Sequence, residues 1–172
     1  MSLLLNRQNQ AAELYERGQK QWAAGKLSAA FRLFLAAAKT GFAPAFGTVA
    51  QFYDNGWAIK TNLETALYWY KRAHRSANSR YRDSTAANNI GCILRDKGEQ
   101  KKAISWFQRA AKLGDGDANL NIAKIYLRSE GSRQTAIRYL QKTCRAPYVT
   151  DGSIEEAKKL LKKIRSKSLR TR

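Results

Sequence analysis

Few side chains in this chain have types and spacing that suit catalysis or metal binding. Catalysis needs a nucleophile with a base, a pair of carboxylates or a metal cluster. His74 is the only histidine, so any Cys-His or Ser-His-Asp site would have to be built around it. We expect a partly packed or surface histidine at this position. No catalytic residue, metal ligand or cofactor is predicted, and the chain is predicted not to be an enzyme.

Two cysteines and one acidic stretch offer the other possible chemistry. Cys92 and Cys144 lie far apart, each in a helix-like pattern, which predicts two buried thiols rather than a disulfide or a metal site. The stretch DGDAN, from Asp115, resembles the start of a calcium-binding loop. Leu120 and Tyr126 would then stand where such a loop needs glycine and glutamate. We predict instead an inter-repeat turn in which Asp117 caps the next helix.

An aromatic pair among basic residues raises the possibility of nucleic-acid binding. Trp106 and Phe107 lie in KKAISWFQRAAKLGDG, in a chain whose net charge is +19. Aromatic faces can stack on bases while lysine and arginine contact phosphates. The alternative is that both rings fill a core. The surrounding pattern favours the core, because it recurs: Ala103, Trp106, Phe107 and Ala110 correspond to Ala66, Trp69, Tyr70 and Ala73.

This recurrence indicates a chain built from helix pairs. Alanine, two aromatic residues three and four positions on, and alanine at position seven share one helical face. With 44% hydrophobic residues and only two prolines, the chain favours helices joined by short turns, and we predict an all-α protein. Further copies of the spacing occur at Gly18, Ala30, Phe34 and Ala37, matching Gly91, Ala103, Phe107 and Ala110, and at Ala123, Ala136, Tyr139 and Leu140.

The second copy resembles a known repeat family. The stretch VAQFYDNGWAIKTNLETALYWYKRA is similar to the Sel-one-like branch of the tetratricopeptide-repeat superfamily. Ala50, Ala58 and Asn62 depart from its pattern. The resemblance implies a right-handed α-α superhelix, or solenoid, of about four helix-turn-helix repeats that binds proteins or peptides. The residues that match the family pattern are Val49, Tyr53, Gly56, Ile59, Ala66, Trp69, Tyr70 and Ala73.

The expected domain covers residues 1–165, followed by a basic, disordered tail at 166–172. The repeats are predicted at residues 10–41, 45–79, 84–114 and 118–145. After Pro147, Ser153 and Glu156 form a capping box at the start of a final helix over 153–165. This helix should cover the exposed end of the stack. Its predicted apolar stripe consists of Ile154, Ala157, Leu160, Leu161 and Ile164.

The resemblance also implies which residues face a partner. In this superfamily the first helix of each repeat lines the inner, concave surface. A row of amides there can bond the backbone of an extended peptide, and flanking cations can hold carboxylates. The alternative is that these amides are simply solvated. The predicted partner-binding residues are Tyr15, Gln19, Thr48, Gln51, Asn55, Asn88, Asn89, Arg95, Asn121, Lys124 and Arg128. Trp22, Cys92 and Leu120 fall at equivalent positions.

Two function classes remain open. The first is a non-enzymatic module that binds an acidic protein or peptide segment in its groove, as an adaptor or an immunity-type inhibitor. The second is RNA or DNA binding through a basic surface of Lys158 to Arg172 with Arg72, Arg75, Arg80 and Arg82. No window is apolar enough for a signal peptide or a membrane helix, so we expect a cytoplasmic monomer.

Overall fold

The computed structural model describes residues 2–76, 84–128 and 132–169. These residues form nine α-helices and no β-strand, which confirms the prediction of an all-α repeat protein. The chain divides into two compact units, Met1–Arg82 and Asp83–Arg172. The single domain over residues 1–165 and the right-handed twist stay predictions.

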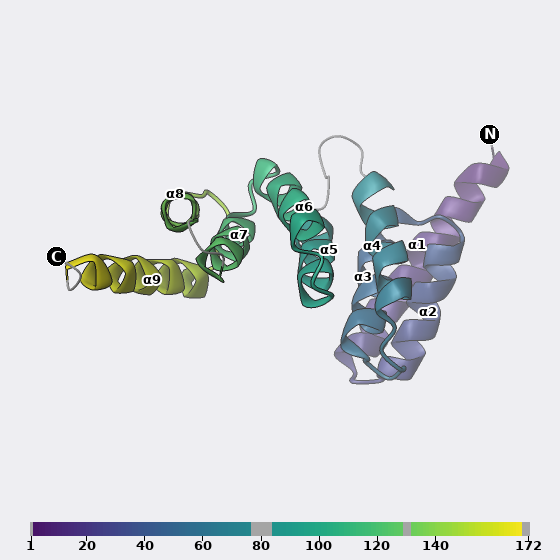
Figure 1. The fold of residues 1–172 in the computed structure, drawn as a ribbon. Coiled ribbons are helices and arrows are strands. Elements are labelled where there is room, and N and C mark those ends of the chain that lie inside the picture. Colours follow the sequence, from purple (N-terminus) through teal and green to yellow (C-terminus); the bar gives the residue numbers. More distant parts are fainter. Residues whose placement is uncertain (1, 77–83, 129–131, 170–172) are drawn as a thin grey trace. The chain divides into compact units, whose positions relative to one another are not determined.

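The first unit consists of two helix pairs. Within each pair the two helices pack against one another, and the pairs meet where α2 packs on α3 (Figure 1). The first helix begins ahead of the predicted repeat boundary at residue 10. The four helices are α1 (Ser2–Ala23), α2 (Leu27–Lys39), α3 (Ala43–Asn55) and α4 (Leu63–Ser76).

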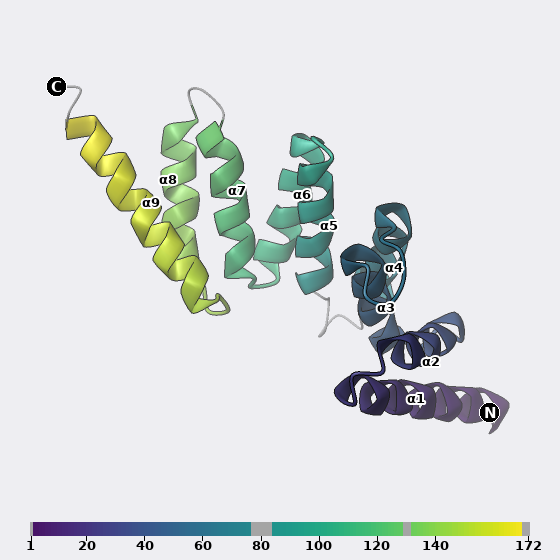
Figure 2. The ribbon, with the colours of Figure 1, turned by 90° about the horizontal axis from the view of Figure 1, so that it is seen from below.

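The second unit consists of two further pairs and a last helix, α9. Figure 2 shows α9 beside α8, and α9 also contacts α7. No helix in the described part of the chain is long and apolar enough to cross a membrane. The helices are α5 (Ser84–Asp96), α6 (Gln100–Lys112), α7 (Gly116–Arg128), α8 (Arg133–Thr143) and α9 (Asp151–Leu169).

Each helix pair is held by a small residue on the first helix and a large one on the second. A Cβ atom added to Gly91 would lie 2.5 Å from the fully buried ring of Phe107. The same atom on Gly18 would lie 2.7 Å from the ring of Phe34. Each ring therefore lies directly on the backbone of the facing helix. This contact confirms the register that the sequence spacing predicted for repeats one and three.

The other two repeats place alanine where these have glycine. Ala50 and Tyr70 are both buried in the second repeat. In the fourth repeat, Ala123 and Leu140 belong to one buried cluster. Since alanine needs more room than glycine, a smaller or differently placed side chain must face it, and leucine meets that need in the fourth repeat.

The first ring of each aromatic pair is covered by a cation three residues later on the same helix. The guanidinium carbon of Arg109 lies 4.4 Å from the ring centroid of Trp106, and that of Arg72 lies 5.1 Å from the ring of Trp69. Cation–π attraction of this kind stabilises a partly exposed ring. Phe107 is therefore a core residue as predicted, whereas Trp106 is only half-buried. Arg109 thus covers one face of Trp106, and the buried ring of Phe107 is not available to a base.

A second aromatic cluster fills the first unit. Trp22 packs with ring centroids 5.1 Å from Phe52 and 4.9 Å from Trp57, which lies in the turn between α3 and α4. Edge-to-face contacts of this kind add to the burial of the rings. The half-buried ring of Trp22 is therefore used in packing, and its family-based placement on a partner-binding surface stays a prediction.

Two predicted helix caps are wrong. At the start of α7, the Ala118 N–H donates to Asp115 Oδ1 at 3.0 Å, so Asp115 is the cap. Asp117 Oδ1 instead accepts bonds from the N–H and Oγ1 of Thr150, at 3.1 and 3.0 Å. Thr150 in turn caps α9, since the Ser153 N–H donates to its Oγ1 at 3.3 Å. In both cases an acceptor nearer the turn takes the capping position.

The last helix covers the end of the second unit as predicted. Ala157 is fully buried in the cluster with Leu120, and Leu160, Leu161 and Ile164 pack against it. Leu120 is therefore a core residue and not a binding residue. The helix continues to Leu169, so residues 166–169 are helical where a disordered tail was predicted. Residues 170–172 lie outside the described part of the chain.

The two cysteines are less buried than predicted. Neither forms a disulfide, and both are half-buried rather than buried. His74 is half-buried on α4, in keeping with the expected partly packed histidine. Of the calcium-loop stretch, Asp115 lies in the predicted turn between α6 and α7, whereas residues 116–119 form the first turn of α7.

The contact between Gly91 and Phe107 generates a stability prediction. Gly91→Ala should destabilise the chain by about 1–3 kcal/mol through overpacking, and Phe107→Ala by about 3–5 kcal/mol through a cavity. The double variant Gly91→Ala/Phe107→Leu, which copies the Ala123–Leu140 pair, should lose less than the sum of Gly91→Ala and Phe107→Leu measured singly. Denaturant unfolding measures all four variants. Gly152→Ala is the control, because its Cβ meets nothing within 4 Å. Additive losses would contradict the packing.

The cap of α7 generates a pH prediction. Burial raises the pKa of the Asp115 carboxyl, and the nearby charge of Asp117 adds to the rise. A carboxyl with a raised folded-state pKa lowers stability once the pH exceeds that value. Asp115→Asn keeps an oxygen for the Ala118 N–H and removes the buried charge, so at pH 7 it should be at least as stable as the wild type.

This advantage should shrink as the pH falls toward about 4, where the wild-type carboxyl becomes protonated as well. Asp115→Ala is the matched comparison, and it should lose about 0.5–2 kcal/mol with the cap. Thermal unfolding between pH 4 and 7 measures both variants. Equal losses for Asn and Ala at pH 7 would show that the negative charge itself is needed.

Candidate functional site

Polar side chains of α5 and α7 form a connected row in the second unit. Asn121 Nδ2 donates to Asn88 Oδ1 at 3.1 Å, and Arg95 Nη1 donates to Asn121 Oδ1 at 3.3 Å. Cys92 Sγ lies 3.9 Å from the same Nδ2 atom. The structure thus brings together three of the predicted residues from adjacent repeats. We call Asn88, Arg95, Asn121 and Lys124 the polar row.

An acidic residue accompanies each cation of the row. Arg95 Nε donates to Asp96 Oδ1 at 2.8 Å, and this bond raises the pKa of the guanidinium. Lys124 Nζ lies 2.7 Å from Glu156 Oε2 of α9. The side chains of Lys124 and Glu156 are 36% and 45% exposed, so water can compete for the pair. Ion pairs this exposed are weak, and another carboxylate can replace either acid at small cost.

The first unit repeats this geometry two helix pairs earlier. The hydroxyls of Tyr15 on α1 and Thr48 on α3 lie 3.4 Å apart. Tyr15 stands three residues before Gly18, as Asn88 stands three before Gly91, and Thr48 and Asn121 each stand two before the equivalent alanine. Both units therefore bring the same two repeat positions together. These positions of neighbouring first helices therefore contact each other, and their role in facing a partner stays a prediction.

The other predicted residues of the first unit are less connected. Gln19 is exposed on α1, and Gln51 is half-buried on α3. Asn55 Nδ2 donates to the backbone oxygen of Gln51 at 2.9 Å, so this amide bonds to a carbonyl in the last turn of its own helix. The first unit also has no cation within this group of residues. Its row is therefore less suited to a carboxylate than the polar row of the second unit.

Two further predicted residues of the second unit lie on the helices that carry the row. Asn89 is half-buried on α5, and Arg128 is exposed at the end of α7.

The sequence analysis missed two acidic residues beside the polar row, Asp96 and Glu156. Glu156 was interpreted as part of a capping box, because its spacing from Ser153 matches that motif. Its partner Lys124 is distant in sequence, and no local pattern connects the two.

The polar row can bind an extended peptide through two kinds of contact. Each amide has a donor and an acceptor, and those of Asn88 and Asn121 are half-buried on helices rather than in a core. Arg95 and Lys124 supply positive charge at either side of them. A strand-like backbone can therefore bond to the amides while its acidic side chains reach the cations.

The basic surface predicted for nucleic acid is only partly available. Arg72 lies over Phe46, with its guanidinium carbon 4.3 Å from the ring centroid, while Arg75 is exposed. Arg80 and Arg82 lie outside the described residues. The basic residues of α9 are exposed along the helix: Lys158, Lys159, Lys162, Lys163 and Arg165.

Models of two repeat families match the chain. A tetratricopeptide repeat matches residues 84–113, which hold α5 and α6. A Sel1 repeat matches residues 49–75 and 116–148, which hold most of α3 with α4, and α7 with α8. The resemblance found in the sequence is therefore confirmed. No curated protein has a sequence that matches this chain.

Solved structures with similar folds include three helical-repeat proteins. A Sel1 repeat protein from Oxalobacter formigenes is 26% identical, with a TM-score of 0.62 over 80% of this chain and 57% of its own length. The protective antigen c5321 of uropathogenic Escherichia coli strains, which displays an SLR fold, is 25% identical, with a TM-score of 0.63 over 78% of this chain and 30% of its own. MamA, at 20% identity, has a TM-score of 0.58 over 92% of this chain and 86% of its own, and shows the fold alone. The chain thus spans little more than half of the first protein and about a third of the second.

Proposed function

Because this chain is a Sel1-like repeat protein of the tetratricopeptide superfamily, we propose that its polar row binds an extended acidic segment of a protein partner. Repeats of this kind are protein-interaction modules and typically serve as non-catalytic scaffolds. The observation that carries the proposal is the bonded group of Asn88, Asn121 and Arg95 across two repeats. A partner would meet a preorganised set of donors and acceptors there.

The acids beside the row support a preference for carboxylates. Asp96 and Glu156 hold Arg95 and Lys124 in the free protein, so each cation lies where a carboxylate can approach it. Both acids are on the surface, and exchange with a partner's aspartate or glutamate keeps the number of ion pairs unchanged. The net charge of +19 would speed the approach of such a partner. The proposal also includes the role of this chain, which would act either as an adaptor for that partner or as an inhibitor of its acidic domain.

The amides support recognition of an extended backbone. Asparagine is unfavourable within a helix, because its side chain competes for backbone bonds. Asn88 and Asn121 bond to each other instead, which aligns their remaining donor and acceptor atoms along the row. A peptide strand can bond to these atoms without any requirement on its own side chains, so the charges provide the sequence preference.

The amide bonds generate a prediction about affinity. Selection from a random peptide library on the full chain should enrich segments rich in aspartate and glutamate. Asn88→Ala/Asn121→Ala should weaken the selected peptide roughly 10-fold or more through lost hydrogen bonds, with unfolding changed by less than about 1 kcal/mol. Gln141→Ala is the control, since this exposed side chain lies on α8, outside the polar row.

The nucleic-acid alternative is supported by the exposed cations of α9. A salt titration with random RNA and duplex DNA tests it. Tight binding of random RNA or duplex DNA, with a steep salt dependence that flattens when Ser166–Arg172 is deleted, would replace the proposal. Enrichment of peptides without acidic residues would also contradict it.

The pair between Lys124 and Glu156 generates a second prediction. Glu156→Gln should raise the affinity for the selected acidic peptide several-fold, because it frees Lys124 from its own acid. Glu155→Gln is the matched control, since it removes the same charge from the adjacent exposed position. Fluorescence anisotropy with a labelled peptide measures both. Equal gains for the two variants would mean that net charge alone controls binding, and an absence of any gain would remove Lys124 from the site.

A further inference from the structure

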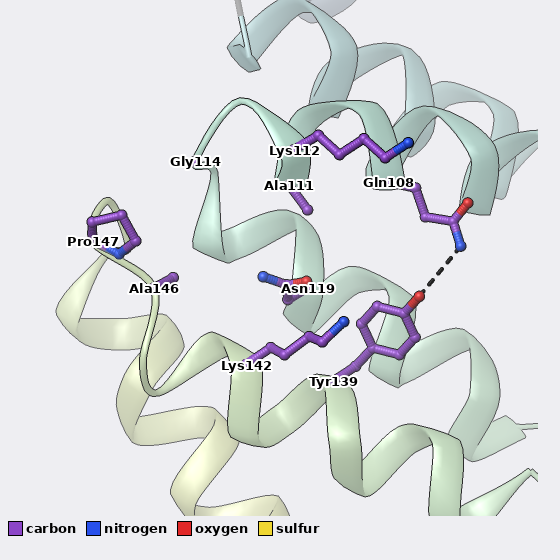
Figure 3. A pocket seen from close by; sticks show the side chains of 9 residues that line it. All are labelled: Gln108, Ala111, Lys112, Gly114, Asn119, Tyr139, Lys142, Ala146 and Pro147. Carbon is purple, nitrogen blue, oxygen red and sulfur yellow. Dashed lines mark hydrogen bonds between the residues drawn. The ribbon is translucent and has the colours of Figure 1, made fainter.

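A pocket of about 540 Å³ lies on the second unit (Figure 3), and none of its lining residues belongs to the polar row. It is formed by α6 and α8, which are the second helices of two repeats, with the first turn of α7, the turn before α7 and the loop before α9. Its volume lies within the range of small-molecule sites. The polar residues that line it are Gln108, Lys112, Asn119, Tyr139 and Lys142, and its apolar residues include Ala111, Ala146 and Pro147.

A nearly buried amide lies in this pocket. Asn119 is only 8% exposed, and Figure 3 shows its side chain near Lys142, while the Lys112 side chain extends toward Gln108. Among the residues that the structure describes, no hydrogen bond of the Asn119 side chain is present. Its amide atoms are not among the fully buried ones, so they open onto the pocket, where a ligand can bond to them in place of water.

Two lysines make the pocket positive. Lys112 of α6 and Lys142 of α8 are both exposed, and within the described part of the chain neither ammonium contacts a carboxylate. Lys142 Nζ lies 5.1 Å from the ring centroid of Tyr139, which leaves its protons able to donate elsewhere. Gln108 Nε2 donates to the Tyr139 hydroxyl at 3.3 Å, so that hydroxyl can still donate its own proton.

We propose that this pocket binds a small organic phosphate monoester. A phosphate monoester carries close to two negative charges at pH 7 and three acceptor oxygens. Two lysine point charges, the Asn119 amide and the Tyr139 hydroxyl supply matching positive charge and donors. A carboxylate would be matched better by the planar fork of an arginine, and the pocket has none. The pocket is larger than inorganic phosphate needs, and Ala111, Ala146 and Pro147 provide apolar surface for an organic group.

The test is a titration of the full chain with glycerol 3-phosphate, inorganic phosphate and succinate. Calorimetry gives the affinities, and NMR follows the side-chain amide of Asn119. We expect glycerol 3-phosphate to bind more tightly than inorganic phosphate, succinate to bind weakest, and the Asn119 amide signal to shift on binding. Lys112→Gln/Lys142→Gln should weaken binding about tenfold or more, because charge-assisted bonds are lost.

A matched variant separates the pocket from the general charge of the chain. Lys101→Gln/Lys158→Gln removes two exposed lysines of the same unit that do not line the pocket, and it should change the affinity less than about twofold. Asn119→Ala should weaken binding while leaving the melting temperature unchanged or higher. The Lys112/Lys142 variant keeps the test valid if the Asn119 variant does not fold, because both lysines are exposed.

Three results would overturn the proposal. Equal losses in the two double-lysine variants would mean that the +19 charge attracts phosphate without a site. An Asn119 signal that does not move would place any binding elsewhere. Binding of a short single-stranded RNA without binding of glycerol 3-phosphate would assign this surface to nucleic acid instead.

Discussion

The direct contact of an aromatic ring with the facing helix backbone is the constraint on which this structure depends. Phe107 lies against Gly91 so closely that even a methyl group would overlap it, and Phe34 lies against Gly18 in the same way. This contact sets both the distance and the register of the two helices in a pair. Once the register is set in adjacent pairs, equivalent positions of neighbouring first helices must face each other. The bonds between Tyr15 and Thr48 and between Asn88 and Asn121 follow from that alignment.

The charge of the chain has more than one structural use. Arg72, Arg109 and Lys142 each cover an aromatic ring on their own helix, so part of the positive charge stabilises the second helices. Another part, Arg95 and Lys124, is paired with acids beside the polar row. A large net charge therefore indicates less about nucleic acid than its size suggests, because the cations differ in what they contact.

The sequence predicted the helix pairs and the aligned rows, because small and large residues recur at fixed spacing and each repeat must satisfy the same packing. It did not predict the caps correctly, since Asp115 and Asp117 are both suitable acceptors and only the position of Thr150 decides between them. The pair of Lys124 with Glu156 was also missed. The pocket was missed for a related reason: Lys112, Asn119 and Lys142 come from three helices, and no local pattern shows that they meet.

The turns inside the helix pairs carry a consequence for engineering. The turn between α1 and α2 covers residues 24–26, whereas the turn between α3 and α4 covers residues 56–62, yet a buried large residue follows the second-helix alanine by the same spacing in both pairs. Extra residues are therefore absorbed between the helices without a shift of the core. Lengthening a surface loop adds little to the entropic cost of bringing its two ends together. The short turn at residues 97–99 is thus a place where a tag, an epitope or a second recognition loop can be inserted into the chain, with the helices on either side left in register.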